Sequence, residues 1–153
     1  MSTKPSDLLA IALLSEIHAL DTLVKARLQK ALPKGMDLSH FMLLNHFARL
    51  GGERTPAQLA RLFHVTRGTM THTLSRLNTA GYIHIRPDWD DARRKWVTIS
   101  PAGRQARNDA LSRITPVFSD VMETVRHTDL REILPILRSL RSYLSELEDD
   151  ARR

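Results

Sequence analysis

The stretch from residue 54 to residue 85 carries cations and hydroxyl groups but no acidic side chain. Within it, residues 67–80 put arginine, histidine, threonine and serine on one side of a projected helix and apolar residues on the other (Met70, Leu74 and Leu77). A solvated helix face normally mixes glutamate with lysine, because such pairs stabilise the helix when they lie four residues apart. An acid-free polar face instead favours contact with phosphates and base edges. An ordinary solvated face is the alternative.

The positive charge of the chain is concentrated around this segment. The net charge is +6, and residues 51–108 hold ten basic and four acidic side chains, whereas residues 109–153 hold seven and nine. Clustered positive charge attracts polyanions such as nucleic acid or an acidic membrane surface. A basic face without any partner stays open as an interpretation of the charge alone.

Two short helices are predicted to position the polar face. Thr55 and Gln58 form a capping box with proline at the first helical position, so a helix begins there. A turn at His64 and Val65 follows, Thr66 can cap the second helix, and Gly81 ends it. A short helix, a tight turn and a second capped helix form a helix-turn-helix arrangement.

A β-hairpin is predicted directly after the second of these helices. Residues 82–86 and 96–99 have the alternation of short strands, and the loop between them contains Arg93 and Arg94. A hairpin in this position is a wing, whose arginines can enter the narrow minor groove of DNA. A charged hairpin without a binding role is the alternative.

Longer amphipathic helices are predicted on both sides of this region. One apolar stripe ends before Pro33, a second helix follows Asp37, and a third stripe runs from residue 130 to residue 147 after a capping box of Asp129 and Glu132. In the second helix the residues expected to face inward are Leu38, Phe41, Met42, Leu44 and Phe47. The terminal stripes can pack on each other or on a second copy of the chain.

Residues 37–107 resemble the MarR-type winged helix-turn-helix transcription regulators. The resemblance lies in Gly51-Gly52, in TPAQLARLFHVTRGTMTHTLSRLNTAGYI (Thr55–Ile83) and in RPDWDDARRKWVTISPAGR (Arg86–Arg104). The last segment matches the wing pattern D-x-R through Asp91-Ala92-Arg93, followed by a strand and an L-T-x-x-G-like turn at residues 99–103. The flanking helices match in placement.

The resemblance implies a mainly α fold with a small β-hairpin wing. Residues 37–108 would form the winged helix-turn-helix DNA-binding region, and residues 1–32 and 109–153 a helical dimerisation region. The expected protein is a homodimeric repressor bound to double-stranded DNA at a pseudo-palindromic operator, with the second helix of the motif in the major groove and the wing in the minor groove. A small-molecule effector that releases the DNA is an additional partner that the resemblance allows.

Site residues carry over position by position. Thr66, Arg67, Thr69, Thr71 and His72 match groove-facing or phosphate-contacting positions, and Arg93 or Arg94 matches the wing arginine that Asp91 braces. Ser75 and Arg76 lie on the same projected face and complete the predicted DNA-contacting set.

Other classes of protein find little support in the sequence. The chain has no cysteine, and it has no nucleophile elbow, phosphate-binding loop or dinucleotide fingerprint, so we expect no enzyme, no cofactor and no metal site. The apolar run 8–14 is too short to cross a membrane, which predicts a cytoplasmic protein without membrane contact. The resemblance suggests that His18, His40 and His46 could border an effector pocket between the dimerisation region and the winged domain. We interpret them instead as ordinary helix-surface residues and assign no ligand residue. The alternatives are a winged-helix interaction module for an acidic partner and an enzyme with a pocket between the helices.

Overall fold

The computed structural model describes residues 4–151 and all their side chains except those of residues 5, 120, 121, 149 and 151. The outermost residues of the expected dimerisation region, 1–3 and 152–153, lie outside the described part. The chain divides into two compact units, Met1–Ile114 and Thr115–Arg153. The first unit contains the whole expected DNA-binding region.

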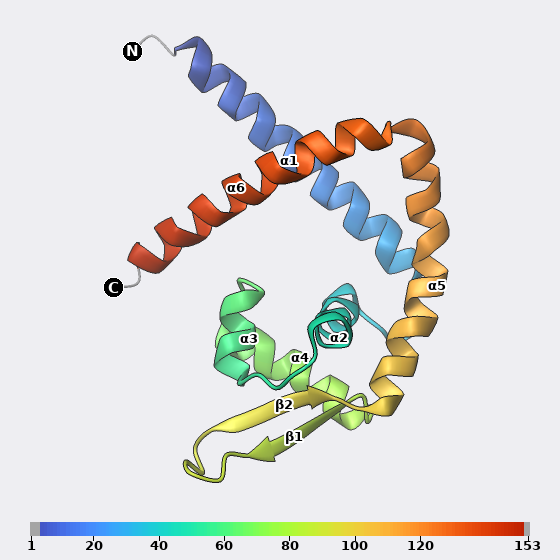
Figure 1. Cartoon of the computed structure of the whole chain (residues 1–153), viewed down its shortest axis with the longest axis vertical. Helices are drawn as coiled ribbons and strands as arrows, with labels where there is room; N and C mark the ends of the chain where they lie inside the picture. The colour runs from blue at the N-terminus through green and yellow to red at the C-terminus, as the bar shows by residue number, and fades with distance from the viewer. Residues whose placement is uncertain (1–3, 152–153) are drawn as a thin grey trace. The chain divides into compact units, whose positions relative to one another are not determined.

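The described part of the chain has six helices, with one two-stranded hairpin between the fourth and fifth (Figure 1). The mainly α fold with a small hairpin is therefore confirmed. The elements are α1 (Pro5–Ala31), α2 (Leu38–Leu50), α3 (Pro56–Leu62), α4 (Arg67–Thr79), β1 (Ile83–Pro87), β2 (Lys95–Ile99), α5 (Pro101–Thr124) and α6 (His127–Ala151).

One hydrophobic core holds the first unit together. It contains side chains from the end of α1, from the inner faces of α2, α3 and α4, from both strands of the hairpin and from the first half of α5. Its largest fully buried side chains are Phe47, Leu43, Leu44, Leu59, Leu77, Ile114 and Val97. Because every one of α2, α3, α4 and the hairpin contributes to the same core, their relative positions are set by packing rather than by flexible connections.

The hairpin is antiparallel and is extended by a third short segment. Ile83 pairs with Ile99 and Pro87 pairs with Lys95, so the strands stay in register along their whole length. Arg54, just before α3, exchanges two backbone hydrogen bonds with Val97, at 3.1 and 2.9 Å. The wing is thus fastened to the segment that enters the helix-turn-helix motif.

Two details of the predicted helices are wrong. In α2 the predicted inward residue Met42 is 45% exposed, whereas its neighbour Leu43 is buried. The last helix begins at His127, so Asp129 lies inside its first turn and does not cap it. Asp129 instead accepts a hydrogen bond from Arg126 Nε at 3.0 Å, because that guanidinium stands just ahead of the helix.

The outer part of α1 and all of α6 keep large apolar side chains at the surface. In α1 these include Leu9, Leu20 and Leu23, which are exposed by 74, 57 and 62%. In α6 they include Ile136 and Leu144. No described helix is long and apolar enough to cross a membrane.

Candidate nucleic-acid interface

Side-chain caps start both helices of the helix-turn-helix motif where the sequence predicts them. Thr55 Oγ1 accepts a hydrogen bond from Gln58 N–H at 3.2 Å, and Gln58 Oε1 accepts one from Thr55 N–H at 2.9 Å. Thr66 Oγ1 accepts from Thr69 N–H at 3.1 Å and so starts α4. In the turn between the helices His64 has a φ of 52°, and Gly81 beyond α4 has a φ of 74°. The caps stabilise the first turn of each helix.

The predicted polar face of α4 is on the outside of the molecule. Met70, Leu74 and Leu77 are buried, as expected, and Thr73 joins them with 7% exposure. The residues of α4 and its cap that were predicted to contact DNA are all exposed: Thr66, Arg67, Thr69, Thr71, His72, Ser75 and Arg76. Helix α4 therefore presents cations and hydroxyl groups, without a carboxylate, to whatever molecule approaches it.

The threonine hydroxyls are held in position by the helix itself. Thr71 donates its hydroxyl hydrogen to Arg67 O at 2.8 Å, and Thr73 donates to Thr69 O at 3.1 Å. The hydroxyl oxygens of Thr66 and Thr69 are 2.9 Å apart and share a hydrogen bond. A hydroxyl that donates to its own backbone keeps its lone pairs free, so Thr71 offers an acceptor rather than a donor at this surface.

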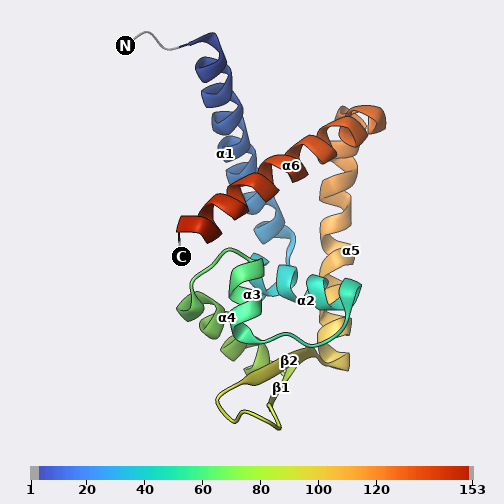
Figure 2. The ribbon, with the colours of Figure 1, turned by 60° about the vertical axis from the view of Figure 1, so that its left-hand side comes forward.

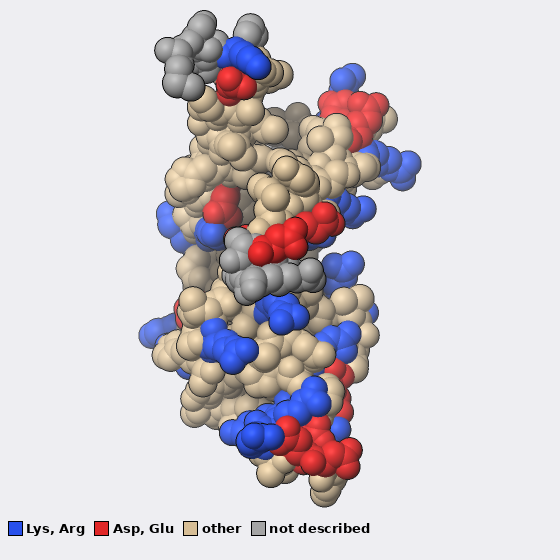
Figure 3. All heavy atoms as spheres, turned by 90° about the vertical axis from the view of Figure 1, so that its left-hand side faces the viewer, with Lys and Arg blue, Asp and Glu red and all other residues tan. Residues whose placement is uncertain are grey.

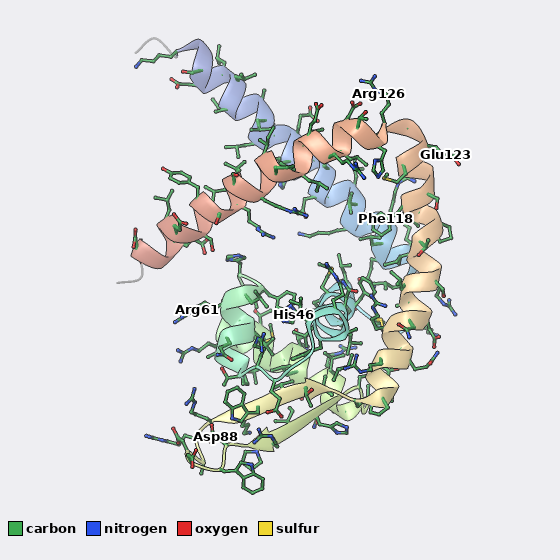
Figure 4. The ribbon with its side chains drawn as sticks, in the orientation of Figure 1. His46, Arg61, Asp88, Phe118, Glu123 and Arg126 are labelled. Atoms are coloured by element: carbon green, nitrogen blue, oxygen red, sulfur yellow. The ribbon has the colours of Figure 1, made fainter. Side chains whose placement is uncertain are left out.

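The loop of the wing is ordered by its acidic residues. Asp88 accepts hydrogen bonds from Trp96 Nε1 at 2.8 Å and from Asp90 N–H at 2.9 Å. These two bonds hold the pKa of Asp88 below its usual value, the Asp90 backbone bond most strongly. Figure 4 labels Asp88 where the loop leaves the strand. The ionised carboxylate thus helps to fold the loop.

Asp91 and the wing arginines are close together. Asp91 Oδ1 accepts from Arg93 N–H at 3.0 Å and from Arg93 Nε at 3.3 Å, while the Arg93 side chain stays 93% exposed. The Arg94 guanidinium lies 5.8 Å from the centre of the Trp96 ring, a cation–π contact. Basic and acidic side chains of the wing stand side by side at the lower end of the face in Figure 3. Figure 2 shows the hairpin loop extending past α4.

A second arginine of the hairpin has a structural partner. Arg86 donates to both carboxylate oxygens of Glu53, at 2.9 and 2.6 Å, and this pairing lowers the pKa of Glu53. Glu53 precedes α3 and Arg86 lies on β1, so the pair adds a side-chain link beside the backbone link of Arg54 to Val97. Arg86 is thereby engaged within the protein.

Helix α4 and the wing meet in a cleft of about 360 Å³, which we call the basic cleft. It brings together four of the predicted residues, Arg67 and Thr71 from α4 with Arg93 and Arg94 from the wing, and it contains no acid. Lys95, which was not among the predicted contacts, also lines it, together with Thr55, Pro56 and Ala57. The basic run 93–95 was the sequence signal for Lys95. Four cations around one cleft make a site for a negatively charged group.

The other predicted contacts do not line this cleft. Ser75 and Arg76 border a smaller pocket beside His40, and Thr69 borders an apolar pocket on the inner side of α4. Thr66 and His72 line none of these three spaces. The nine predicted residues therefore do not form one cluster. They border different spaces around α4 and the wing.

The apolar pocket has a volume of about 620 Å³ and lies between α1, α2 and the helix-turn-helix motif. Its walls are mostly apolar, with Gln29 and Ser39 among the few polar residues; the apolar and threonine lining includes Met42, Leu43, Phe63, Val65, Met70 and Thr73. Gln29 links α1 to α2, since it donates to Met36 O at 3.1 Å and accepts from Leu38 N–H at 2.9 Å. None of His18, His40 and His46, which the resemblance allowed around an effector pocket, lines this space. Its lining residues were not predicted, because the pocket arises only where separate helices meet.

No group of three histidine, aspartate or glutamate side chains in the described part of the chain could hold a metal ion. Contrary to the prediction of helix-surface histidines, His40 is buried and His46 is half-buried in α2. Only His18 of the three lies at the surface.

Comparison with known proteins gives a consistent result. Residues 34–94 match the model of the MarR family. No curated protein matches the chain. A cysteine-to-serine mutant of MarR from E. coli, in complex with operator DNA, is 18% identical with a TM-score of 0.75, over 90% of this chain and 99% of that one.

Two further solved structures share the fold. BldR, a transcriptional regulator from Sulfolobus solfataricus, is 22% identical with a TM-score of 0.74, over 94% of this chain and 99% of its own. BpsR from Bordetella bronchiseptica, whose DNA binding is described as regulated by 6-hydroxynicotinic acid, is 15% identical with a TM-score of 0.75, over 85% and 98%. Residues 34–94 therefore match the MarR family, and the chain shares the fold of these solved regulators.

Proposed function

We propose that this protein is a sequence-specific DNA-binding transcriptional regulator, a homodimeric repressor that binds a pseudo-palindromic operator. The observation that carries the proposal is the basic cleft, which Arg67, Arg93, Arg94 and Lys95 line and which no acidic side chain lines. A DNA backbone phosphate fits between an element in the major groove and one in the adjacent minor groove. The cleft has this form, a helix on one side and a hairpin loop on the other.

The type of each side chain indicates whether it contacts phosphates or bases. Arginines and lysine in the cleft neutralise phosphates and supply most of the affinity, which makes binding sensitive to salt. The exposed face of α4 meets base edges, where His72 and Ser75 donate or accept hydrogen bonds and Thr71 accepts them. The exposed Arg93 enters the minor groove, held in its orientation by Asp91.

Exposed apolar residues support the homodimer. Helices α1 and α6 each expose many large apolar side chains at the surface of their own unit, among them Leu9, Leu23 and Ile136. Apolar patches of this kind mark sites of protein–protein contact. A second copy of the chain would cover such surfaces. Two subunits would then present two α4 helices to half-sites about one helical turn apart, roughly 34 Å.

The apolar pocket supports a small-molecule effector. Its size of about 620 Å³ and its few polar groups suit a small, mainly apolar ligand. Its walls include Val65, Thr69 and Met70, which belong to the turn and the core side of α4. A ligand in this pocket would shift α4. The spacing between the two α4 helices of the dimer would then change, and the dimer would release the DNA.

The test is binding of the protein to DNA from upstream of its own gene across a salt series. We expect affinity to fall steeply with salt, with a slope of about 0.9 for each phosphate contact. Arg67→Ala and Arg93→Ala should weaken binding and reduce the slope by about one each. The matched control is Arg113→Ala, an exposed arginine of α5 outside the cleft.

Several results would contradict the proposal. They are an absence of binding at low salt, a flat salt response, or equal losses in the cleft variants and in the control. An acidic protein partner that wild type binds and that charge-reversed Arg67→Glu and Arg76→Glu lose, with no DNA binding by wild type, would favour the interaction module instead.

A further inference from the structure

His40 occupies an unusual place at the start of α2. It is the third residue of the helix, and its Nδ1 accepts a hydrogen bond from Asp37 N–H at 3.1 Å. This is the role that glutamate or glutamine plays in a capping box. A ring nitrogen that accepts a hydrogen bond carries no proton, so the neutral ring bears its hydrogen on Nε2. The cap thereby selects one tautomer and makes Nε2–H a donor.

That donor has no partner among the described residues, although the His40 side chain is only 6% exposed. The two ring nitrogens point in divergent directions, and with Nδ1 turned to the cap, Nε2 is the polar atom left for the pocket that His40 lines. This pocket has a volume of about 340 Å³ and lies between the start of α2 and the second half of α4. An N–H that no protein acceptor occupies can donate to an acceptor that enters this pocket.

The opposite wall of the pocket supplies a cation and hydroxyl groups. Arg76 lines it together with Ser75 and Thr79, and no aspartate or glutamate does. The guanidinium of Arg76 has no acidic partner in the described part of the chain. Burial, and after it the nearby charges of Arg76 and His72, lower the pKa of His40, whereas Asp37 raises it. The ring is therefore a neutral donor in a positively charged setting.

We propose that His40 and Arg76 form an oxyanion site that binds one phosphate group. Nε2–H of His40 donates one hydrogen bond and the guanidinium of Arg76 supplies the charge, with the hydroxyls of Ser75 and Thr79 within the same pocket. The phosphate comes from one of two sources, the DNA backbone beside α4 or a free phosphate-bearing molecule. The first source rests on the proposed DNA-binding function, and the second does not.

The test follows the histidine side-chain NMR signals of the full chain during titration with inorganic phosphate, against sodium chloride at equal ionic strength. We expect the His40 Nε2–H signal to move saturably with phosphate and not with chloride. Arg76→Gln should weaken phosphate binding about tenfold or more, because it removes a charged donor. Arg113→Gln, an exposed change of the same kind in α5, should leave binding unchanged.

A second variant tests the donor. His40→Glu keeps an acceptor for the Asp37 N–H, as in an ordinary capping box, but it has no hydrogen to donate and repels an anion. It should fold, as thermal unfolding will show, and bind no phosphate. If His40→Glu does not fold, Arg76→Gln alone tests the phosphate site. Arg76 is exposed, so its replacement should leave the fold intact.

A DNA duplex that binds in the salt series then distinguishes the sources. A duplex that moves the His40 signal, and is competed by excess phosphate, identifies the DNA backbone; a bound duplex that leaves the signal unmoved identifies a free phosphate compound. Phosphate binding without any duplex binding retains the site and removes the proposed function. No saturable shift with phosphate, or equal affinity in wild type and Arg76→Gln, overturns the proposal.

Discussion

At the scale of single residues, His46 shows what a buried polar atom costs this fold. Its Nε2 is buried without a hydrogen-bond partner in the described part of the chain, and its ring meets Phe47 and Phe63 edge-on at 5.6 and 5.8 Å. Figure 4 labels it on α2. Burial, with a smaller effect of Arg54, lowers the pKa of His46 below 6.5. The fold therefore favours the neutral ring.

The prediction is a loss of stability at acid pH that His46 causes in part. Below a pH of about 6.5 the unfolded chain binds a proton that the folded chain resists, so the free energy of unfolding falls as pH decreases. His46→Leu should raise stability by about 1 kcal/mol near neutral pH, since it removes the unpaired nitrogen, and should flatten the acid decrease. Urea unfolding at a series of pH values measures both effects.

The buried His40 contributes to the same decrease, so the variant should retain part of it. A pH dependence identical to that of wild type would show that His46 titrates in the folded protein as it does in the unfolded chain.

At the scale of elements, the junction between α4, β1 and α5 determines where the wing stands. Ser100 donates from its hydroxyl to Gly81 O at 2.6 Å, accepts from Gly103 N–H at 2.9 Å, and donates its backbone N–H to Tyr82 O at 3.0 Å. A Cβ on Gly103 would lie 2.0 Å from Tyr82 O, a backbone atom that cannot rotate away. The first turn of α5 must therefore be bare at this point.

A pair of glycine-to-alanine changes tests this contact. Gly103→Ala should destabilise the protein by about 3 kcal/mol, because the helix must move away from β1. Gly68→Ala, also in a helix, would meet only Thr66 Oγ1 at 3.9 Å and should stabilise by up to about 1 kcal/mol. Chemical unfolding of the two variants provides the comparison; equal effects in both would mean that helix propensity alone governs these positions.

At the scale of the whole molecule, the stripe along α6 is the feature that most needs a partner. None of its described residues is buried, although the helix carries an apolar residue every three or four positions. Such a seam is typical of a helix that packs against other helices. Four residues of this stripe are 39–49% exposed: Ile133, Leu137, Leu144 and Leu147.

Sedimentation should therefore give twice the chain mass of 17.4 kDa. Leu144→Glu should shift the protein to monomer and weaken operator binding, because a charge in the seam is costly to bury and a monomer binds one half-site. Ser142→Glu, an exposed position on another side of α6, is the control and should remain a dimer. A Leu144→Glu protein that keeps the dimer mass would place the subunit contact elsewhere.

Much of the local structure was predictable because it depends on near neighbours in sequence. The caps at Thr55 and Thr66 and the end of α4 at Gly81 each involve residues within four positions, and all three form as expected. The exposed side of α4 followed from the same periodicity. Errors arose where distant packing decided, as when Leu43 rather than Met42 entered the core.

Caps and periodicity act over a few residues, so the helix-turn-helix motif and the outward polar face of α4 could be predicted before any packing was known. Three features required the folded chain: the sharing of one cleft by Arg67, Thr71, Arg93 and Arg94, the pairing of Glu53 with Arg86 across 33 residues, and the burial of His40 at the start of α2. Those outcomes depend on how separate helices and the hairpin pack around one core. Such packing is a property of the whole unit, which no short segment encodes.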